Sequence, residues 1–317
     1  MGLLSTFSEN VKRSPRFALM LGLLVYLMCL MVLVPLWLYL ISLIFGLEMS
    51  ELQLIVGGSV NQEANYPWIF RLIQAGNQLS TWGAAGWLMA SMMQAPTREL
   101  GLTHQGKAFQ IPLAMLVMLF ALPLVQWLQL DADSFQLPAF LSEAEAWMKR
   151  QEDVFGQALL EVLGTENWGV LLVNLLIFAM IPAFCEEVFF RGFLQKQLGR
   201  MMKPSWAIVT QALIFSFIHF QFYGFFARAF LGGILGYLVY RSGSLWTGIA
   251  GHFVFNATSI FLAFLGTKYP ALSGVDPAQE ISFPWTVVLG SVMLVAGALY
   301  LFHRQGSAKP ATEKIYE

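Results

Sequence analysis

IPAFCEEVFFR, at residues 181–191, places two adjacent glutamates inside an otherwise apolar segment. Insertion of an ionised side chain at the centre of a membrane helix costs roughly 3 kcal/mol of free energy. Glu186 and Glu187 do not stabilise an apolar segment in a way that would offset this cost. Ionisable residues within membrane helices are therefore candidates for a functional site. The stretch therefore predicts a membrane-spanning helix that contains residues of a functional site.

The composition of the whole chain indicates a membrane protein. Of 317 residues, 57% are hydrophobic and 12% are charged, and the mean hydropathy is +0.63. An ordinary soluble domain has about 25% charged residues. Cys29 and Cys185 both lie in apolar segments, which excludes a disulfide framework and a zinc-finger spacing. We expect the lipid bilayer as a partner, with no nucleic acid and no cofactor.

Apolar runs divide the chain into membrane spans. A helix needs about 20 apolar residues to cross a bilayer, and by that measure the chain is an all-α polytopic bundle with about eight transmembrane helices. The first run is much longer than the apolar core of a signal peptide and is interpreted as a signal anchor. Gln74, Asn77, Gln78 and Ser80 make the start of the second run amphipathic. The predicted spans are residues 17–46, 68–95, 109–130, 167–200, 204–223, 225–241, 245–266 and 283–303.

The spans and their connections predict three parts. Residues 1–165 hold three spans and most of an extracytoplasmic loop at 131–166, residues 166–266 hold a core of four spans, and residues 267–317 hold the last span and a cytoplasmic tail. The loop contains an acidic, helical stretch around residues 142–154. We interpret the loop as a connector or interfacial helix, with a substrate-gating element as the alternative.

Basic residues orient the predicted bundle, because cytoplasmic connections are enriched in Lys and Arg. With the N-terminus inside, 13 of the 18 Lys and Arg residues fall on the cytoplasmic side, while most acidic residues fall outside. The sequence therefore predicts a multi-pass protein of the cell (plasma) membrane with both termini in the cytoplasm. The 13 residues are Lys12, Arg13, Arg16, Arg98, Lys107, Arg191, Lys196, Arg200, Lys203, Arg241, Arg304, Lys309 and Lys314.

Helical spacing relates the first three ionisable residues to one another. Glu187 and Arg191 are four residues apart, so an ion pair within one helix is available. Glu186 is rotated by about 100° from Glu187 and faces elsewhere. The two carboxylates are therefore predicted to have different roles.

Two histidines in later spans are predicted to reach the same region. Glu186 lies 17 residues before the turn at residue 203, and His219 lies 16 residues after it. Antiparallel helices that leave a common turn bring such side chains to one level. His252 and Asn256 are four residues apart and share a helix face. We expect the side chains of Glu186, His219, His252 and Asn256 to line one cavity.

These side chains meet the requirements of amide hydrolysis. A carboxylate in an apolar cavity, such as Glu186, can act as a general base near neutral pH, and His219 would help to hold and polarise a water. His252 and Asn256 supply hydrogen-bond donors for a developing oxyanion, and Arg191 would keep the second carboxylate ionised. The set predicts attack of water on an amide of a peptide or protein substrate that reaches the membrane cavity.

Other roles remain open for the same residues. Glu186, His219 and His252 suit a zinc ion by residue type, although no His-Glu-x-x-His signature is present. Cys185 is a further candidate nucleophile, but the neighbouring carboxylates disfavour its thiolate. The buried charges also fit a structural ion-pair network, a transporter or a non-catalytic scaffold that binds a peptide.

Three motifs together carry a family resemblance. EExxxR at residues 186–191, FxxxH at 215–219 and HxxxN at 252–256 follow one another on successive predicted spans. In this order they resemble the motifs of the CPBP family, the CAAX-protease and bacteriocin-processing (ABI) proteins, which include Rce1-like endopeptidases. The resemblance covers residues 172–264, under a third of the chain.

The resemblance implies a fold, an activity and a role for each residue. The fold would be a polytopic bundle of eight helices, and the activity that of a glutamate-type intramembrane endopeptidase without a metal. The implied roles are general base for Glu186 with His219, support for Glu187 paired with Arg191, and an oxyanion hole for His252 with Asn256.

Overall fold

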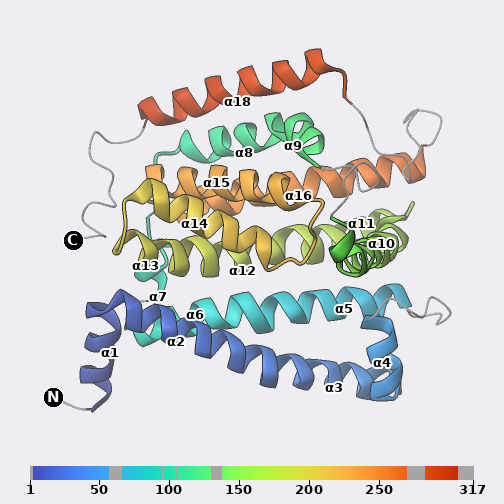
Figure 1. Cartoon of the computed structure of the whole chain (residues 1–317), viewed down its shortest axis with the longest axis horizontal. Helices are drawn as coiled ribbons and strands as arrows, with labels where there is room; N and C mark the ends of the chain where they lie inside the picture. Colours follow the sequence, from blue (N-terminus) through green and yellow to red (C-terminus); the bar gives the residue numbers. More distant parts are fainter. Residues whose placement is uncertain are drawn as a thin grey trace.

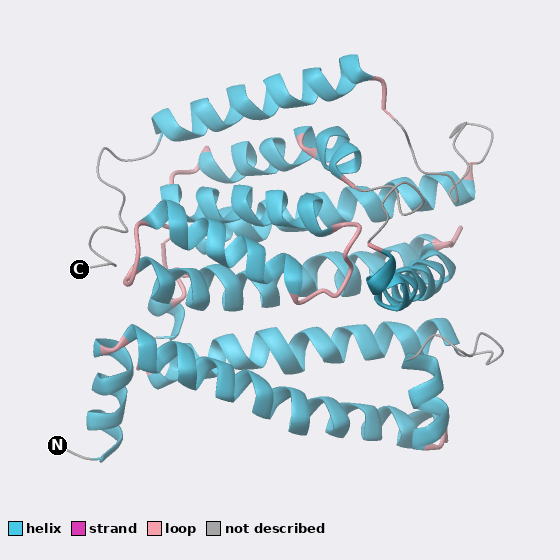
Figure 2. Cartoon of the chain, in the orientation of Figure 1, coloured by secondary structure: helices cyan, strands magenta, loops and turns pink. Residues whose placement is uncertain are grey.

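The structure, a computed structural model, describes residues 3–56, 66–94, 96–104, 106–129, 138–269 and 283–305. Every regular element in these ranges is a helix (Figure 2). Most helices run along one long axis, and α1 (Leu3–Arg13), α4 (Met49–Val56) and α10 (Ser142–Leu163) lie across it (Figure 1). The prediction of an all-α fold is confirmed.

Four helical segments are long and apolar enough to cross a membrane, and all four coincide with predicted spans. They are Pro15–Phe45, Trp168–Gly199, Leu245–Lys268 (α16) and Trp285–Gln305 (α18). A fifth candidate is the pair α8 (Gln110–Phe120) and α9 (Leu122–Leu128), which meet at an angle of 42°. Pro123 explains the bend, because it lacks the amide hydrogen that would continue the helix.

The other three predicted spans are helical but fall outside this group, so a count of eight is not confirmed. The first is the continuous segment of α5 (Tyr66–Gln78), η2 (Leu79–Gly83) and α6 (Ala84–Met92), which contains the buried Arg71 and a polar face. The second is α14 (Pro204–Phe217), which has only 14 residues. The third is α15 (Phe225–Ser242), which contains Arg228.

The segment that carries the two glutamates contains two π-helical stretches. It consists of α11 (Trp168–Leu175), η4 (Leu176–Met180), α12 (Ile181–Glu187), η5 (Val188–Leu194) and α13 (Gln195–Gly199), in which η4 and η5 are π-helical. At the end of η4 the Ile181 N–H donates to the carbonyl of Leu176, five residues back, and Pro182 follows at once. Since proline cannot donate, a wider turn forms before it, and such π turns are frequent at functional sites.

Aromatic packing fixes this segment against the first helices. The rings of Tyr26 and Trp82 stack at 4.6 Å, and Trp82 lies 5.1 Å from the fully buried Phe190. The contacts join α2 (Pro15–Met28), η2 and η5. As a result, the helix with the glutamates is held directly against the second predicted span.

The helix α14 ends early, at Phe217. Its 14 residues extend about 21 Å, less than the roughly 30 Å of a bilayer core. Phe220, in the connection that follows, has a left-handed backbone with φ 52°, which strains a bulky residue. α10 covers this connection, because the Tyr223 N–H donates to Glu152 at 3.2 Å.

The helix α10 is longer than predicted. It begins at Ser142 but continues to Leu163 rather than ending near residue 154. Its second half has an apolar face, on which Ala158, Val162 and Leu163 are buried. Packing of this face against the bundle stabilises the additional turns of the helix. The preceding part of the predicted loop, residues 131–137, and the predicted tail from residue 306 lie outside the described residues.

Large apolar side chains also cover the outside of the bundle. Met20, Met31, Ile44 and Met293 are each 69–76% exposed, and they lie on segments that are long enough to cross a membrane. Exposed apolar surface of this extent marks an interface. On such segments it is the surface expected to face lipid.

Candidate active site

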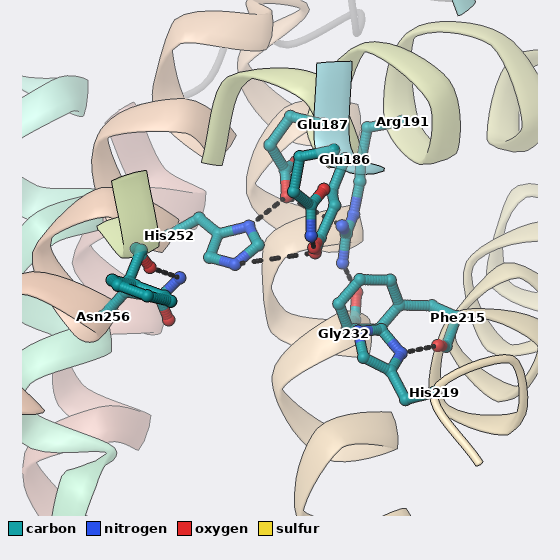
Figure 3. A network of polar contacts seen from close by, with 10 residues as sticks. Glu186, Glu187, Arg191, Phe215, His219, Gly232, His252 and Asn256 are labelled. Atoms are coloured by element: carbon teal, nitrogen blue, oxygen red, sulfur yellow. Dashed lines mark hydrogen bonds and ion pairs between the residues drawn. The ribbon is translucent and has the colours of Figure 1, made fainter. Parts of the chain in front are cut away.

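The described structure brings the six predicted residues into one region (Figure 3). Three helical segments supply them. Glu186 and Glu187 end α12, Arg191 lies in η5, His219 follows α14 in the connection to α15, and His252 and Asn256 lie in α16.

Glu187 and Arg191 form an ion pair with no exposed side-chain area. Nη1 of Arg191 lies 2.7 Å from Oε1 of Glu187. Nη2 of Arg191 donates to the carbonyl of Gly232 at 3.1 Å, and the guanidinium lies 4.7 Å from the centre of the Phe215 ring. The sequence counted Arg191 among the cytoplasmic charges, and in the structure the bundle encloses this residue completely.

Gly248 allows α16 to approach this ion pair. A Cβ atom at this position would lie 2.5 Å from Oε2 of Glu187 and 2.7 Å from a methyl group of Val239. No larger residue fits without moving the carboxylate. The close approach brings the next turn of α16, with His252, into contact with both glutamates.

His252 lies between the two carboxylates. Its Nδ1 is 3.1 Å from Oε1 of Glu187, and its Nε2 is 3.8 Å from Oε2 of Glu186. The Glu187 oxygen already accepts from Arg191, so Nδ1 of His252 is the donor in this hydrogen bond. Nε2 then faces Glu186 as an acceptor in the neutral ring and as a donor in the doubly protonated ring.

Glu186 has a different environment, as its rotation from Glu187 predicted. Its Oε1 accepts a hydrogen bond of 2.9 Å from Nε2 of Gln78 in α5, and its Oε2 faces His252 across 3.8 Å. The side chain is almost completely buried. One oxygen of Glu186 is therefore held, and the other lies at a distance that is too long for a direct hydrogen bond.

The ring of His219 is oriented by the main chain. Its Nδ1 lies 2.6 Å from the carbonyl of Phe215, and a carbonyl only accepts, so Nδ1 carries a hydrogen. Nε2 of the neutral ring is then left as an acceptor. The strained backbone of Phe220 directly follows this histidine.

A cavity of about 860 Å³ lies beside these residues, and Glu186, His219 and Asn256 line it. Nδ2 of Asn256 is 3.4 Å from the carbonyl of Phe178, a long contact that leaves this donor weakly engaged. His252 is not among the lining residues, but its Nε2 reaches Glu186 in the wall. Three of the four residues expected to share a cavity line it directly, and the fourth contacts one of them.

Sequence reasoning missed the face of α5 and η2 that lines the other side of this cavity. Gln74, Asn77, Gln78 and Thr81 all contribute, at the spacing of one helix face. Three of these polar residues were noticed in the sequence, but only as features that weaken the second span. Their common face was the signal for a second wall of the site.

The helix α10 supplies a third wall that was also missed. Trp147, Gln151, Phe155 and Leu159 follow one another at intervals of four residues and all line the cavity. The same helix covers the connection that carries His219. The extracytoplasmic loop predicted as a connector therefore contains a helix that contacts the candidate site.

Two of the alternative chemistries can be compared with the described residues. Cys185 is a free, buried thiol that packs against Gly83 and does not line the cavity. Among the described residues, no three side chains of His, Cys, Asp and Glu are grouped as a metal site. Glu186, His219 and His252 are thus close together without forming a compact set of ligands.

Residues 168–258 match the family model described as Type II CAAX prenyl endopeptidase Rce1-like. The matched segment extends from α11 into α16 and contains all six predicted residues. No curated protein and no solved structure matches the chain. The match confirms the family resemblance carried by the three motifs.

Proposed function

From the Rce1-like character of residues 168–258, we propose that this chain is an intramembrane endopeptidase of the glutamate type. The observation that carries the proposal is the cavity of about 860 Å³, because Glu186, His219 and Asn256 line it together within an apolar helical bundle. A carboxylate, an imidazole acceptor and an amide donor around one space are the groups that hydrolysis of an amide requires.

In the proposed reaction, Glu186 is the general base. Its Oε2 takes a proton from a water as the water oxygen bonds to the carbonyl carbon of the substrate, while Nε2 of His219 accepts a hydrogen bond from the same water. Glu186 then passes the proton to the leaving nitrogen as the C–N bond breaks. The products are a carboxylic acid and an amine, and no other reactant is needed.

The oxyanion of the tetrahedral intermediate is assigned to the opposite helix. Asn256 offers the Nδ2–H, and His252 offers an Nε2–H when its ring is doubly protonated. Glu187 and Arg191 do not face the cavity and serve to orient His252 through its Nδ1. The proposed site therefore separates the base on α12 from the donors on α16.

Asn256→Ala is expected to lower kcat by about 10²- to 10³-fold, the usual effect of losing one oxyanion donor. KM should change little, because the amide acts mainly on the charge of the intermediate. The measurement is steady-state cleavage of one peptide by wild type and variant. The matched control is Ser259→Ala, a neighbouring cavity residue on α16 that bonds its own helix at Phe255, and an equal loss in that control would contradict the assigned role.

The proposed activity can be tested with purified protein in lipid nanodiscs and a peptide library. The library holds matched peptides with and without a prenyl group, since the substrate is proposed only as a peptide or protein segment that reaches the cavity. Cleavage at one internal bond by wild type, and its loss in Glu186→Ala, would support the proposal. Cleavage that is equal in both proteins would reject it.

We also propose that eight segments cross the plasma membrane with both termini in the cytoplasm. The segment Tyr66–Met92 extends about 40 Å as a helix, long enough to cross. α14 and α15 form the short hairpin whose connection α10 covers. Polar side-chain contacts also gather several segment ends at one end of the bundle, namely Lys107 with Gln305, Arg241 with His303, Lys196 with Glu99 and Arg200 with Lys12.

Reporter fusions after Lys107, Lys203 and Arg304 are expected to show a cytoplasmic location, because basic residues remain on that side. A fusion within residues 138–166 is expected to lie outside. The measurement uses paired reporters that are active on opposite sides of the membrane. A cytoplasmic signal from residues 138–166 would contradict both the orientation and the count of eight spans.

A further inference from the structure

Gln78 is the residue that holds the proposed base from the other side of the cavity. Its Nε2 donates to Oε1 of Glu186 at 2.9 Å. The contact joins positions 108 residues apart, so Gln78 lies far outside the segment 168–258 that matches the family. The orientation of the amide is fixed chemically, because the reverse orientation would place its oxygen against a carboxylate oxygen.

The hydrogen bond leaves the two oxygens of Glu186 inequivalent. Oε1 accepts from Gln78, and Oε2 faces His252 at 3.8 Å with no direct hydrogen bond. A carboxylate that is held through one oxygen cannot turn freely about its last bond. Oε2 is consequently the oxygen that remains available to take a proton.

The other polar atom of Gln78 is enclosed by the protein. Its Oε1 is buried and has no hydrogen-bond partner among the described residues. A buried carbonyl oxygen without a partner is costly, so the side chain of Gln78 is not placed here for stability.

We propose that Gln78 is a positioning residue of the hydrolytic site. It holds Glu186 through Oε1, so that Oε2 is left to accept the proton of the attacking water. The inference rests on the proposed function, since it assigns the base activity to Glu186. It places part of the catalytic geometry on the second predicted span.

Gln74 provides a matched control within the same helix. It precedes Gln78 by four residues, shares its face and lines the same cavity. In the described part of the chain, it has no hydrogen bond to Glu186. A comparison of variants at the two glutamines therefore distinguishes the effect of a polar cavity wall from the effect of the hydrogen bond to Glu186.

The experiment measures kcat and KM separately for the peptide that wild type cleaves fastest in the library. Gln78→Leu is expected to lower kcat by about 10- to 100-fold, because a hydrogen bond to a charged group is lost, with KM within about threefold. Gln74→Leu changes the cavity wall without touching Glu186, so it is expected to act mainly on KM and to lower kcat clearly less than Gln78→Leu does. Gln78→Met keeps the approximate size of the side chain but removes its donor, and it should lose as much kcat as Gln78→Leu.

A double variant tests whether Gln78 acts through Glu186. In the background of Glu186→Gln, the change Gln78→Leu is expected to cause no further loss of kcat, because coupled residues are not additive. Wild-type kcat in either Gln78→Leu or Gln78→Met, together with an inactive Glu186→Gln, would overturn this inference and leave the proposed function intact. An active Glu186→Gln would instead overturn the proposed function itself.

Discussion

Glu186→Gln is expected to lower kcat at least about 100-fold, the low end of what a positioned general base contributes. The change keeps the shape of the side chain and leaves an acceptor for the 2.9 Å hydrogen bond from Gln78, but it removes the basic oxygen that faces His252. Peptide binding should survive, since the cavity keeps its volume. Paired measurements of cleavage and of peptide binding by fluorescence anisotropy would show both effects.

Two controls separate the hydrolytic site from its alternatives. Strong chelators are expected to leave wild-type cleavage intact, and loss of activity that added zinc restores would favour a metal site of Glu186, His219 and His252 instead. Absence of cleavage by wild type, together with a Glu186→Gln protein that keeps the wild-type phenotype in the cell, would favour a scaffold. An uptake phenotype without cleavage would favour a transporter.

Glu187→Gln is expected to damage the folded protein more than the reaction. It leaves the charge of Arg191 without its partner at a position with no exposed area, and removing one member of a buried ion pair typically costs about 3–5 kcal/mol. Gly248 leaves no space in which the side chain could move away. The yield of purified protein and its thermal midpoint in nanodiscs should both fall clearly below those of wild type.

The matched control for Glu187→Gln removes both charges at once. The double variant Glu187→Leu, Arg191→Met has no stranded ion and is expected to recover much of the lost thermal midpoint, because apolar residues often replace a buried ion pair at little cost. It should remain poorly active, since Nδ1 of His252 loses its acceptor. A double variant that is less stable than Glu187→Gln would contradict this account.

The sequence predicted those parts of the site whose residues are related by helical spacing or by their distance from a common turn. Glu187 and Arg191 are four residues apart and form the ion pair that this spacing allows. Glu186 and His219 lie at nearly equal distances from one turn and line one cavity. Spacing within a helix and offset from a turn fix side-chain positions closely, because the helix itself is rigid.

The parts that were missed depend on packing between distant segments. Gln78 was recognised as a polar residue in a weak span, but nothing in the local sequence indicates a partner 108 residues away. The length of α10 was underestimated because its acidic first half resembles a solvated connector, whereas Val162 and Leu163 are buried by tertiary contacts. The pairing of Arg191 with Glu187 was predicted, but its complete enclosure depends on neighbours from other helices.

The polar face of the second predicted span has a consequence for the synthesis of the chain. Arg71 donates to Asn174, and Gln78 donates to Glu186, so partners arrive 103 and 108 residues after the groups that need them. At about 5–20 residues per second, that delay is roughly 5–20 s. Under the proposed eight-span arrangement, uncompensated polar groups in lipid are costly, so the emerging segment 66–92 would be retained at the insertion machinery until residues 168–199 arrive, and the two would then enter the bilayer as a pair.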